Sequence, residues 1–141
     1  MKVPVLHHPN LPRYQTEDAA GMDLHAVLNA PITLGPLERW LVPTDLRVAI
    51  PKGHAWFIVS RSGLTLKKGL IVLNAPGIID ADYRGSVGVI LCNMSNTPVE
   101  IEPGERVAQA LLMKVERVEW DAVDSLDETD RGEGGYGSTN K

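Results

Sequence analysis

The hydrophobic residues of this chain fall into many short runs that are separated by turn residues. Leu46, Val48 and Ile50 alternate with other residues, as expected of a half-buried strand over 45–50. Residues 54–59 are dense in aromatic and β-branched side chains, which predicts a central strand. The remaining runs predict further short strands, from about Met22 onward and over 2–6, 31–34, 37–42, 86–93, 106–115 and 116–120.

Only one segment favours a helix. Residues 64–68 fit one or two helical turns, and Gly69 would end them, because glycine readily adopts the left-handed conformation that closes a helix. The 13 glycines and 10 prolines are spread along the chain, as expected for turns between short strands. We therefore predict an all-β fold, a distorted jelly-roll-like barrel or sandwich with at most one short helix.

The length of 141 residues fits one domain followed by a tail. We predict a β domain over 1–120 and a C-terminal arm over 121–141. The arm is acidic at first and glycine-rich towards its end, and it has no apolar periodicity, which predicts a flexible tail. An extended chain from Trp120 to Tyr136 would span roughly 50 Å, far enough to reach a neighbouring subunit.

Charge and cysteine content narrow the functional classes. The net charge of −4 argues against a general nucleic-acid binder, which would usually show a basic face. A phosphate site would have to be built locally from a few arginines and backbone N–H groups. Cys92 is the only cysteine, so no internal disulfide can form. The N-terminus lacks the apolar core of a signal peptide and no apolar run reaches membrane-spanning length, so we expect a cytoplasmic protein without a membrane partner.

The stretch 74–85 carries the most unusual chemistry. Residues Asn74 to Gly77 predict a turn in which Gly77 permits a positive φ. Apolar residues then run into Asp80 and Asp82, which would share one face of a continuing strand. Two carboxylates side by side repel each other unless they are solvated, hydrogen-bonded or facing a cation. The pair therefore indicates either a polar hairpin tip or functional acids.

Two further segments have residue types that suit an anion. Arg61, Ser62 and Gly63 follow the predicted central strand; arginine offers a planar fork for phosphate oxygens, and glycine lets a phosphate approach the backbone. The same residues also fit a helix start with a surface arginine. Gln109 lies in an otherwise apolar strand, where it is either a satisfied structural amide or a ligand contact.

The tail ends in a glycine-rich segment with one aromatic residue. Arg131 and Ser138 could contact phosphates, and the ring of Tyr136 could stack on a base. The segment is not a P-loop, because it lacks the Gly-Lys-Ser/Thr ending and the strand–helix context. A flexible linker is the alternative interpretation.

Five segments of the chain resemble, in order, the five motifs of the trimeric dUTP pyrophosphatase (dUTPase) family. They read AGMDLHA at 20–26, SRSGL at 60–64, NAPGIIDADYRG at 74–85, RVAQ at 106–109 and RGEGGYGS at 131–138. The resemblance implies a jelly-roll-like homotrimer with active sites shared between subunits. It also implies hydrolysis of dUTP to dUMP and pyrophosphate with Mg²⁺, which would limit uracil incorporation into DNA and supply dUMP for dTMP synthesis.

The resemblance further implies roles for the residues of the hairpin. Asp80 would be the general base that activates a water for in-line attack on the α-phosphorus. Tyr83 would pack on the deoxyribose and leave no room for a 2′-hydroxyl. The uracil pocket would be formed by Asn74 and the hairpin backbone, including Gly77 and Ile79.

By the same resemblance, other residues would hold the phosphates, the metal and the outer face of the base. The implied phosphate contacts are Arg61, Ser62, Gly63 and Gln109 in the body and Arg131 and Ser138 in the tail. Tyr136 would cover the uracil, and Gly137 would also contact the substrate. Asp23 would hold a water of the Mg²⁺ shell rather than the metal itself.

Four positions depart from the family pattern, and other functions remain open. The departures are Tyr136 for the usual Phe, Ser60 for Pro, Ile78 for Thr and Ser86 for Glu, and they bear on affinity more than on activity. One alternative is a related dCTP deaminase or a bifunctional deaminase–dUTPase, which would need a carboxylate beside the base. The others are a nucleotide-binding switch without catalysis and a structural jelly-roll protein without a ligand.

Overall fold

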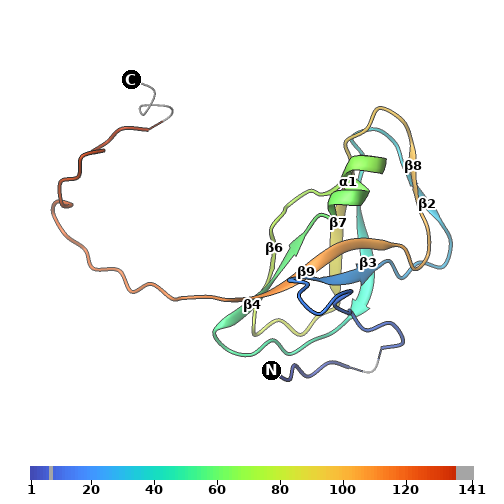
Figure 1. Ribbon diagram of the computed structural model, residues 1–141, viewed down its shortest axis with the longest axis horizontal. Coiled ribbons are helices and arrows are strands. Elements are labelled where there is room, and N and C mark those ends of the chain that lie inside the picture. The colour runs from blue at the N-terminus through green and yellow to red at the C-terminus, as the bar shows by residue number, and fades with distance from the viewer. Residues whose placement is uncertain (7, 136–141) are drawn as a thin grey trace.

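The computed structural model describes residues 1–6 and 8–135, and β-strands form the body of this part of the chain (Figure 1). Nine strands and one short helix occur among these residues, which confirms the predicted all-β class. The elements are β1 (Met22–His25), β2 (Ile32–Leu34), β3 (Arg39–Leu46), β4 (His54–Val59), α1 (Ser62–Lys68), β5 (Leu70–Val72), β6 (Gly77–Ile79), β7 (Val87–Asn93), β8 (Val99–Ile101) and β9 (Arg106–Lys114).

The strands form three antiparallel sheets around one apolar core. Their orders are β1-β9-β4-β6, β3-β7-β5 and the pair β2-β8. The predicted central strand, β4, lies between β9 and β6. Each sheet contributes buried side chains to the core, including Leu24 of β1, Val107 of β9, Val89 of β7 and Leu34 of β2.

Helix α1 forms where the sequence favours a helix, and it begins two residues earlier than predicted, at Ser62. Leu64 is buried against the core, and Lys67 and Lys68 lie in the last turn, where positive charge is favourable. Gly69 ends the helix with a φ of 69°, and its N–H donates to the carbonyl of Thr65. Within the described ranges, no helix has the length and apolar character needed to cross a membrane.

The strands predicted over 37–42 and 45–50 have different boundaries in the structure. β3 continues from Arg39 to Leu46, with a bulge between Pro43 and Leu46 at which Asp45 has a φ of 55°. Val48 and Ile50 are buried as their alternation predicts, yet only Val48 pairs, through an isolated bridge to Val5. Residues 2–6 therefore make a single bridge rather than an edge strand.

The predicted strand over 116–120 does not form. β9 ends at Lys114, opposite His54, the first residue of β4, so the ladder has no partner beyond this point. Val115 still donates its N–H to the carbonyl of Gly53. The chain then runs away from the body (Figure 1). Trp120 is 89% exposed. The division into a domain over 1–120 and an arm over 121–141 stays a prediction.

Asn93, the last residue of β7, joins three parts of the fold through its buried amide. Its Nδ2 donates to the carbonyls of Leu34, at 2.9 Å, and Thr97, at 2.8 Å. Its Oδ1 accepts from the N–H and the hydroxyl of Ser95, at 2.9 and 2.7 Å. The side chain is fully buried, so no water can replace these bonds.

We expect Asn93→Ala to lower the free energy of unfolding by about 3 kcal/mol, because it leaves buried carbonyls and an N–H without partners. Urea denaturation at fixed protein concentration measures the change. Asn96→Ala is the matched control, since Asn96 is exposed and should change stability by less than about 0.5 kcal/mol. Equal stability of the two variants would contradict this role of Asn93.

Candidate active site

A cavity of about 330 Å³ lies beside the turn that joins β5 to β6. Its polar lining includes Asn74 and Asp80, and Ile58, Val72 and Val89 form apolar walls. Mostly apolar cavities with a few converging polar groups are typical of small-molecule sites. The further lining residues include Gly77, Ile79 and Tyr83, so all five residues that were predicted for the hairpin site line this one cavity.

Gly77 has a different role from the one predicted. It is the first residue of β6, and it is absent from the described glycines that have a positive φ. Its missing side chain matters because a Cβ there would lie 3.2 Å from Nδ2 of Asn74 and 3.5 Å from Cβ of Ile58. Gly77 thus lets Asn74 approach the strand closely.

Asp80 and Asp82 do not share one face of a strand, and that prediction is wrong. β6 ends at Ile79, and the chain turns at once, with the N–H of Tyr83 donating to the carbonyl of Asp80 at 3.2 Å. Both acids are exposed, which reduces their repulsion. Both acids line a second cavity together with Ala81 and Arg84, but only Asp80 also lines the 330 Å³ cavity.

The ring of Tyr83 is held in place by its own turn. Its hydroxyl donates to the carbonyl of Ser86 at 3.0 Å. Nη1 of Arg84 donates to the carbonyls of Ala81 and Tyr83, at 2.7 and 2.8 Å. Any side chain at Gly85 would overlap the tyrosine ring. These contacts fix the ring at the edge of the cavity.

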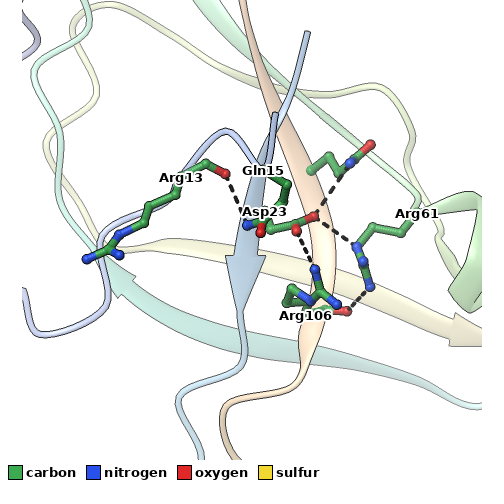
Figure 2. A network of polar contacts seen from close by, with 6 residues as sticks. Arg13, Gln15, Asp23, Arg61 and Arg106 are labelled. Carbon is green, nitrogen blue, oxygen red and sulfur yellow. Dashed lines mark hydrogen bonds and ion pairs between the residues drawn. The ribbon is translucent and has the colours of Figure 1, made fainter. Parts of the chain in front are cut away.

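A second polar cluster surrounds Asp23 of β1 (Figure 2). Its Oδ1 accepts from Nε of Arg61 at 2.9 Å and more weakly from Nε2 of Gln109 at 3.5 Å. Its Oδ2 accepts from Nη1 of Arg106 at 3.1 Å. Arg61 also donates from Nη1 to the carbonyl of Arg106 at 3.1 Å. The cluster therefore joins three of the segments in which the sequence placed candidate site residues.

The backbone holds Asp23 from both sides of β1. Asp23 is paired with Gln109 of β9, and its N–H donates to the carbonyl of Arg13 at 3.3 Å. Figure 2 shows that the side chain of Arg13 points away from Asp23. A Cβ at Gly21 would lie 3.3 Å from Cδ1 of Leu111 and 3.4 Å from Cβ of Gln109, so the glycine leaves room for these two side chains of β9.

The helix start carries the other predicted phosphate contacts. Ser62 and Gly63 are exposed in the first turn of α1, directly after Arg61. The hydroxyl of Ser60, the residue before Arg61, accepts a hydrogen bond from the N–H of Val72 at 2.8 Å. Arg106 is the residue whose side chain the sequence reasoning missed. The feature that could have indicated it is the position of this arginine at the start of an apolar strand, directly after a turn.

His25 lies beside the cluster without adding to its charge. Burial lowers the pKa of His25, Asp23 opposes that shift, and the guanidinium groups of Arg106 and Arg61 lower the pKa further. Its Nδ1 is buried without a hydrogen-bond partner in the part of the chain that the structure describes. A neutral imidazole follows at neutral pH, so Asp23 faces two cations rather than three.

Asp23 does not fit the predicted contact with metal-bound water in this arrangement. Its side chain is only 2% exposed, and both oxygens accept bonds from guanidinium groups. Two positive charges within hydrogen-bond distance also disfavour an approaching divalent cation. Among residues 1–6 and 8–135, no group of three or more His, Cys, Asp or Glu side chains could hold a metal ion.

The cavity and the Asp23 cluster are separate in one chain. Gln109 lies opposite Val59 of β4, whereas Ile79 lies opposite Trp56 on the other edge of β4. Three positions along β4 and two strand spacings place the Cα atoms of Gln109 and Ile79 about 14 Å apart. The structure therefore does not bring Asp80 together with Arg61 and Gln109.

The tail residues lie apart from both clusters. Nε of Arg131 donates to the carbonyl of Gly134 at 2.8 Å, within one turn of the tail. Figure 1 shows this segment well away from the sheets. Tyr136, Gly137 and Ser138 lie outside the described residues.

The fold is similar to that of solved dUTPase structures. A variant of the Staphylococcus bacteriophage 80alpha dUTPase with dUpNHpp superposes with a TM-score of 0.86, at 25% identity over 98% of each chain. A dUTPase variant from phage phi11 of S. aureus, described with a structural Mg(II) ion, gives a TM-score of 0.80 at 22% identity, over 91% of this chain and all of that one. The likeness over nearly the whole chain supports the predicted jelly-roll-like fold.

Sequence comparison agrees with the fold. The deoxyuridine 5'-triphosphate nucleotidohydrolase of Fusobacterium nucleatum subsp. nucleatum is 51% identical over 93% of this chain and 90% of its own length. That of the Wolbachia of Brugia malayi is also 51% identical, over 93% of this chain and 85% of its own length. A model of the dUTPase family matches residues 8–140, and the chain therefore belongs to the dUTPase family.

Proposed function

We propose that this protein hydrolyses dUTP to dUMP and pyrophosphate. The observation that carries the proposal is the cavity in which Asn74, the backbone of β6 and the carboxylate of Asp80 meet. Family membership and relatives named as deoxyuridine 5'-triphosphate nucleotidohydrolases support the choice of substrate. Such an activity limits uracil incorporation into DNA and supplies dUMP for dTMP synthesis.

The cavity suits a flat, uncharged base with a polar edge. Its walls are apolar, and backbone N–H and C=O groups of the turn and β6 offer donors and acceptors at one side. Uracil presents alternating acceptor and donor groups that such a backbone edge can pair with. We assign base reading to Asn74, Gly77 and Ile79, and rejection of a 2′-hydroxyl to the fixed ring of Tyr83.

Asp80 is the proposed general base. It lines the cavity, it is exposed to water, and it makes no ion pair within the described part of the chain. Its carboxylate is therefore free to accept a proton from a water that attacks the α-phosphorus in line with the leaving pyrophosphate. Asp82 does not line this cavity and receives no catalytic role.

The phosphate chain is assigned to the arginine side of the sheet. Arg61, Ser62, Gly63 and Gln109 are the proposed contacts, and Arg61 keeps donors free after its bonds to Asp23 and Arg106. We propose that Mg²⁺ is required and that phosphate oxygens and waters hold it, as this ion prefers. In the tail, Arg131 and Ser138 are the proposed γ-phosphate contacts, and Tyr136 and Gly137 those at the base.

A homotrimer with shared sites completes the proposal. The distance of about 14 Å between the Cα atoms of Ile79, in the cavity wall, and Gln109, in the Asp23 cluster, is explained if a second chain supplies the phosphate contacts. Large apolar side chains are exposed on the body, including Leu37 at 69%, Leu41 at 62% and Trp40 at 53%, and such surfaces support association. The cytoplasmic location stays a prediction.

The central test is pyrophosphate release from dUTP, dTTP, dCTP and UTP, with Mg²⁺ and in EDTA. We expect turnover of dUTP alone, and only with Mg²⁺, because the cavity walls exclude other bases and Tyr83 excludes ribose. Reaction in ¹⁸O-labelled water should label dUMP. Ammonia release from dCTP would favour a deaminase, and binding of dUTP without turnover would favour a nucleotide switch.

Asp80→Asn should lower kcat by about 10²- to 10⁴-fold, because an amide cannot accept the proton of the attacking water. Binding of dUpNHpp should stay near the unsubstituted level, since the amide has a similar shape. Asp82→Asn, two residues away and outside the cavity, is the matched control and should keep its activity. Near-normal kcat in Asp80→Asn would remove Asp80 from the base role.

A chain that ends before Arg131 should lose most of its turnover while its melting temperature stays the same. The described residues from 131 to 135 hydrogen-bond only within their own turn, so their removal leaves the sheets intact. Steady-state kinetics and thermal melts of the two chains provide the comparison. Unchanged kinetics would show that the tail takes no part in the reaction.

A further inference from the structure

The carboxylate of Asp23 is the most enclosed charged group among the described residues that the proposed function involves. Its side chain is 2% exposed, whereas those of Arg61 and Arg106 are 23% and 46% exposed. The negative charge therefore lies beneath two guanidinium groups that reach towards solvent. No other buried acid occurs among the described residues.

Two guanidinium groups side by side repel each other unless an anion lies between them. Asp23 supplies that anion, and each of its oxygens takes one arginine, at 2.9 Å for Arg61 and 3.1 Å for Arg106. The bond from Nη1 of Arg61 to the carbonyl of Arg106 fixes the distance between the two arginines further. One net positive charge remains on the exposed side of the cluster.

The donors that remain unused point to an anion as the ligand. Arg61 uses Nε and one N–H of Nη1, and Arg106 uses only Nη1, so each keeps further N–H groups. Donors held in place before the ligand arrives cost little reorganisation when it binds. A phosphate group of a nucleoside triphosphate has the charge and the oxygens for this arrangement.

We infer that Asp23 is a positioning residue of the phosphate site: it holds Arg61 and Arg106 side by side for one substrate phosphate, and it acts independently of the metal. The inference rests on the proposed function for its ligand. It assigns Arg106 to phosphate binding, and it replaces the metal-shell role that the family resemblance implied for Asp23, which its enclosed geometry does not fit.

The test measures binding of dUpNHpp by calorimetry, once with Mg²⁺ and once in EDTA. Asp23→Asn should weaken binding by about tenfold or more under both conditions and by the same factor, because charged hydrogen bonds to the arginines are lost. The tightening that Mg²⁺ adds should therefore stay unchanged. Loss confined to the Mg²⁺ condition would assign Asp23 to the metal, and no loss under either condition would remove its positioning role; both outcomes overturn the inference.

Glu105→Gln is the matched control, because it makes the same acid-to-amide change in a separate ion pair. Glu105 accepts from Nζ of Lys68 at 2.6 Å and bonds neither arginine through its side chain. Its variant should bind dUpNHpp as the unsubstituted protein does. Equal weakening in both variants would show a general loss of structure and would contradict a specific role of Asp23.

Folding and the proposed function are checked separately. If Asp23→Asn does not fold, the double variant Asp23→Asn/Arg106→Gln is measured instead and compared with Arg106→Gln. The double variant removes one negative and one positive charge together, so the net charge of the cluster is unchanged. In EDTA the double variant should bind dUpNHpp more weakly than Arg106→Gln does, because Arg61 also loses its hydrogen bond to the carboxylate. Equal binding by these two variants would contradict the positioning role of Asp23. The unsubstituted protein tests the proposed function by itself: failure to hydrolyse dUTP refutes that function. Turnover of dUTP together with equal binding by Arg106→Gln and the double variant refutes only the role of Asp23.

Discussion

The placement of the charged residues depends on the double pairing of β9. This strand pairs with β1 through one edge and with β4 through the other. The register sets Gln109 opposite Asp23 on one side and opposite Val59 on the other. Since Arg61 follows β4 by two residues, backbone pairing alone brings segments 38 and 86 residues apart into one hydrogen-bonded cluster.

Burial of the Asp23 carboxylate costs free energy unless the cluster supplies hydrogen-bond donors to it. Removing a carboxylate from water costs several kcal/mol unless its oxygens are fully bonded. Three side-chain donors meet this demand, and the N–H of Asp23 is bonded to Arg13 as well. Because both arginines remain partly exposed, solvent weakens each ion pair, and the gain in stability is modest. The arrangement is therefore explained better by the need to orient arginines than by stability.

Residue patterns predicted those parts of the molecule that depend on local chemistry. The aromatic and β-branched run over 54–59 is the central strand β4, and Gly69 ends the single helix as its backbone freedom allows. The alternation at 46, 48 and 50 predicted burial correctly, but no separate strand forms there, because Leu46 ends β3 and Val48 makes one isolated bridge. Alternation reports which side faces the core, whereas pairing depends on whether another strand runs alongside.

Features that depend on distant partners could not be read from the sequence. The end of β9 at Lys114 is set by the start of β4, sixty residues earlier in the chain. The bond between Arg106 and Asp23 joins residues 83 positions apart, so neither residue type nor spacing reveals it. The hairpin residues were easier to place, because Asn74 to Tyr83 are close in the chain and their turn brings them to one cavity.

The two acids at the centre of the proposed site differ because their surroundings differ. The carboxylate of Asp23 lies between two guanidinium groups, and each of its oxygens accepts a bond from one of them. Asp80 follows Ile79, whose Cα lies about 14 Å from that of Gln109 by the strand register, and its exposed side chain keeps its oxygens available to water. A general base placed beside the arginines of its own chain would have its oxygens engaged by guanidinium groups, as those of Asp23 are. In the proposed shared site, the acid assigned to water activation and the arginines assigned to phosphate binding are apart within one chain, and a second chain would bring them together around the substrate, which would keep both groups effective.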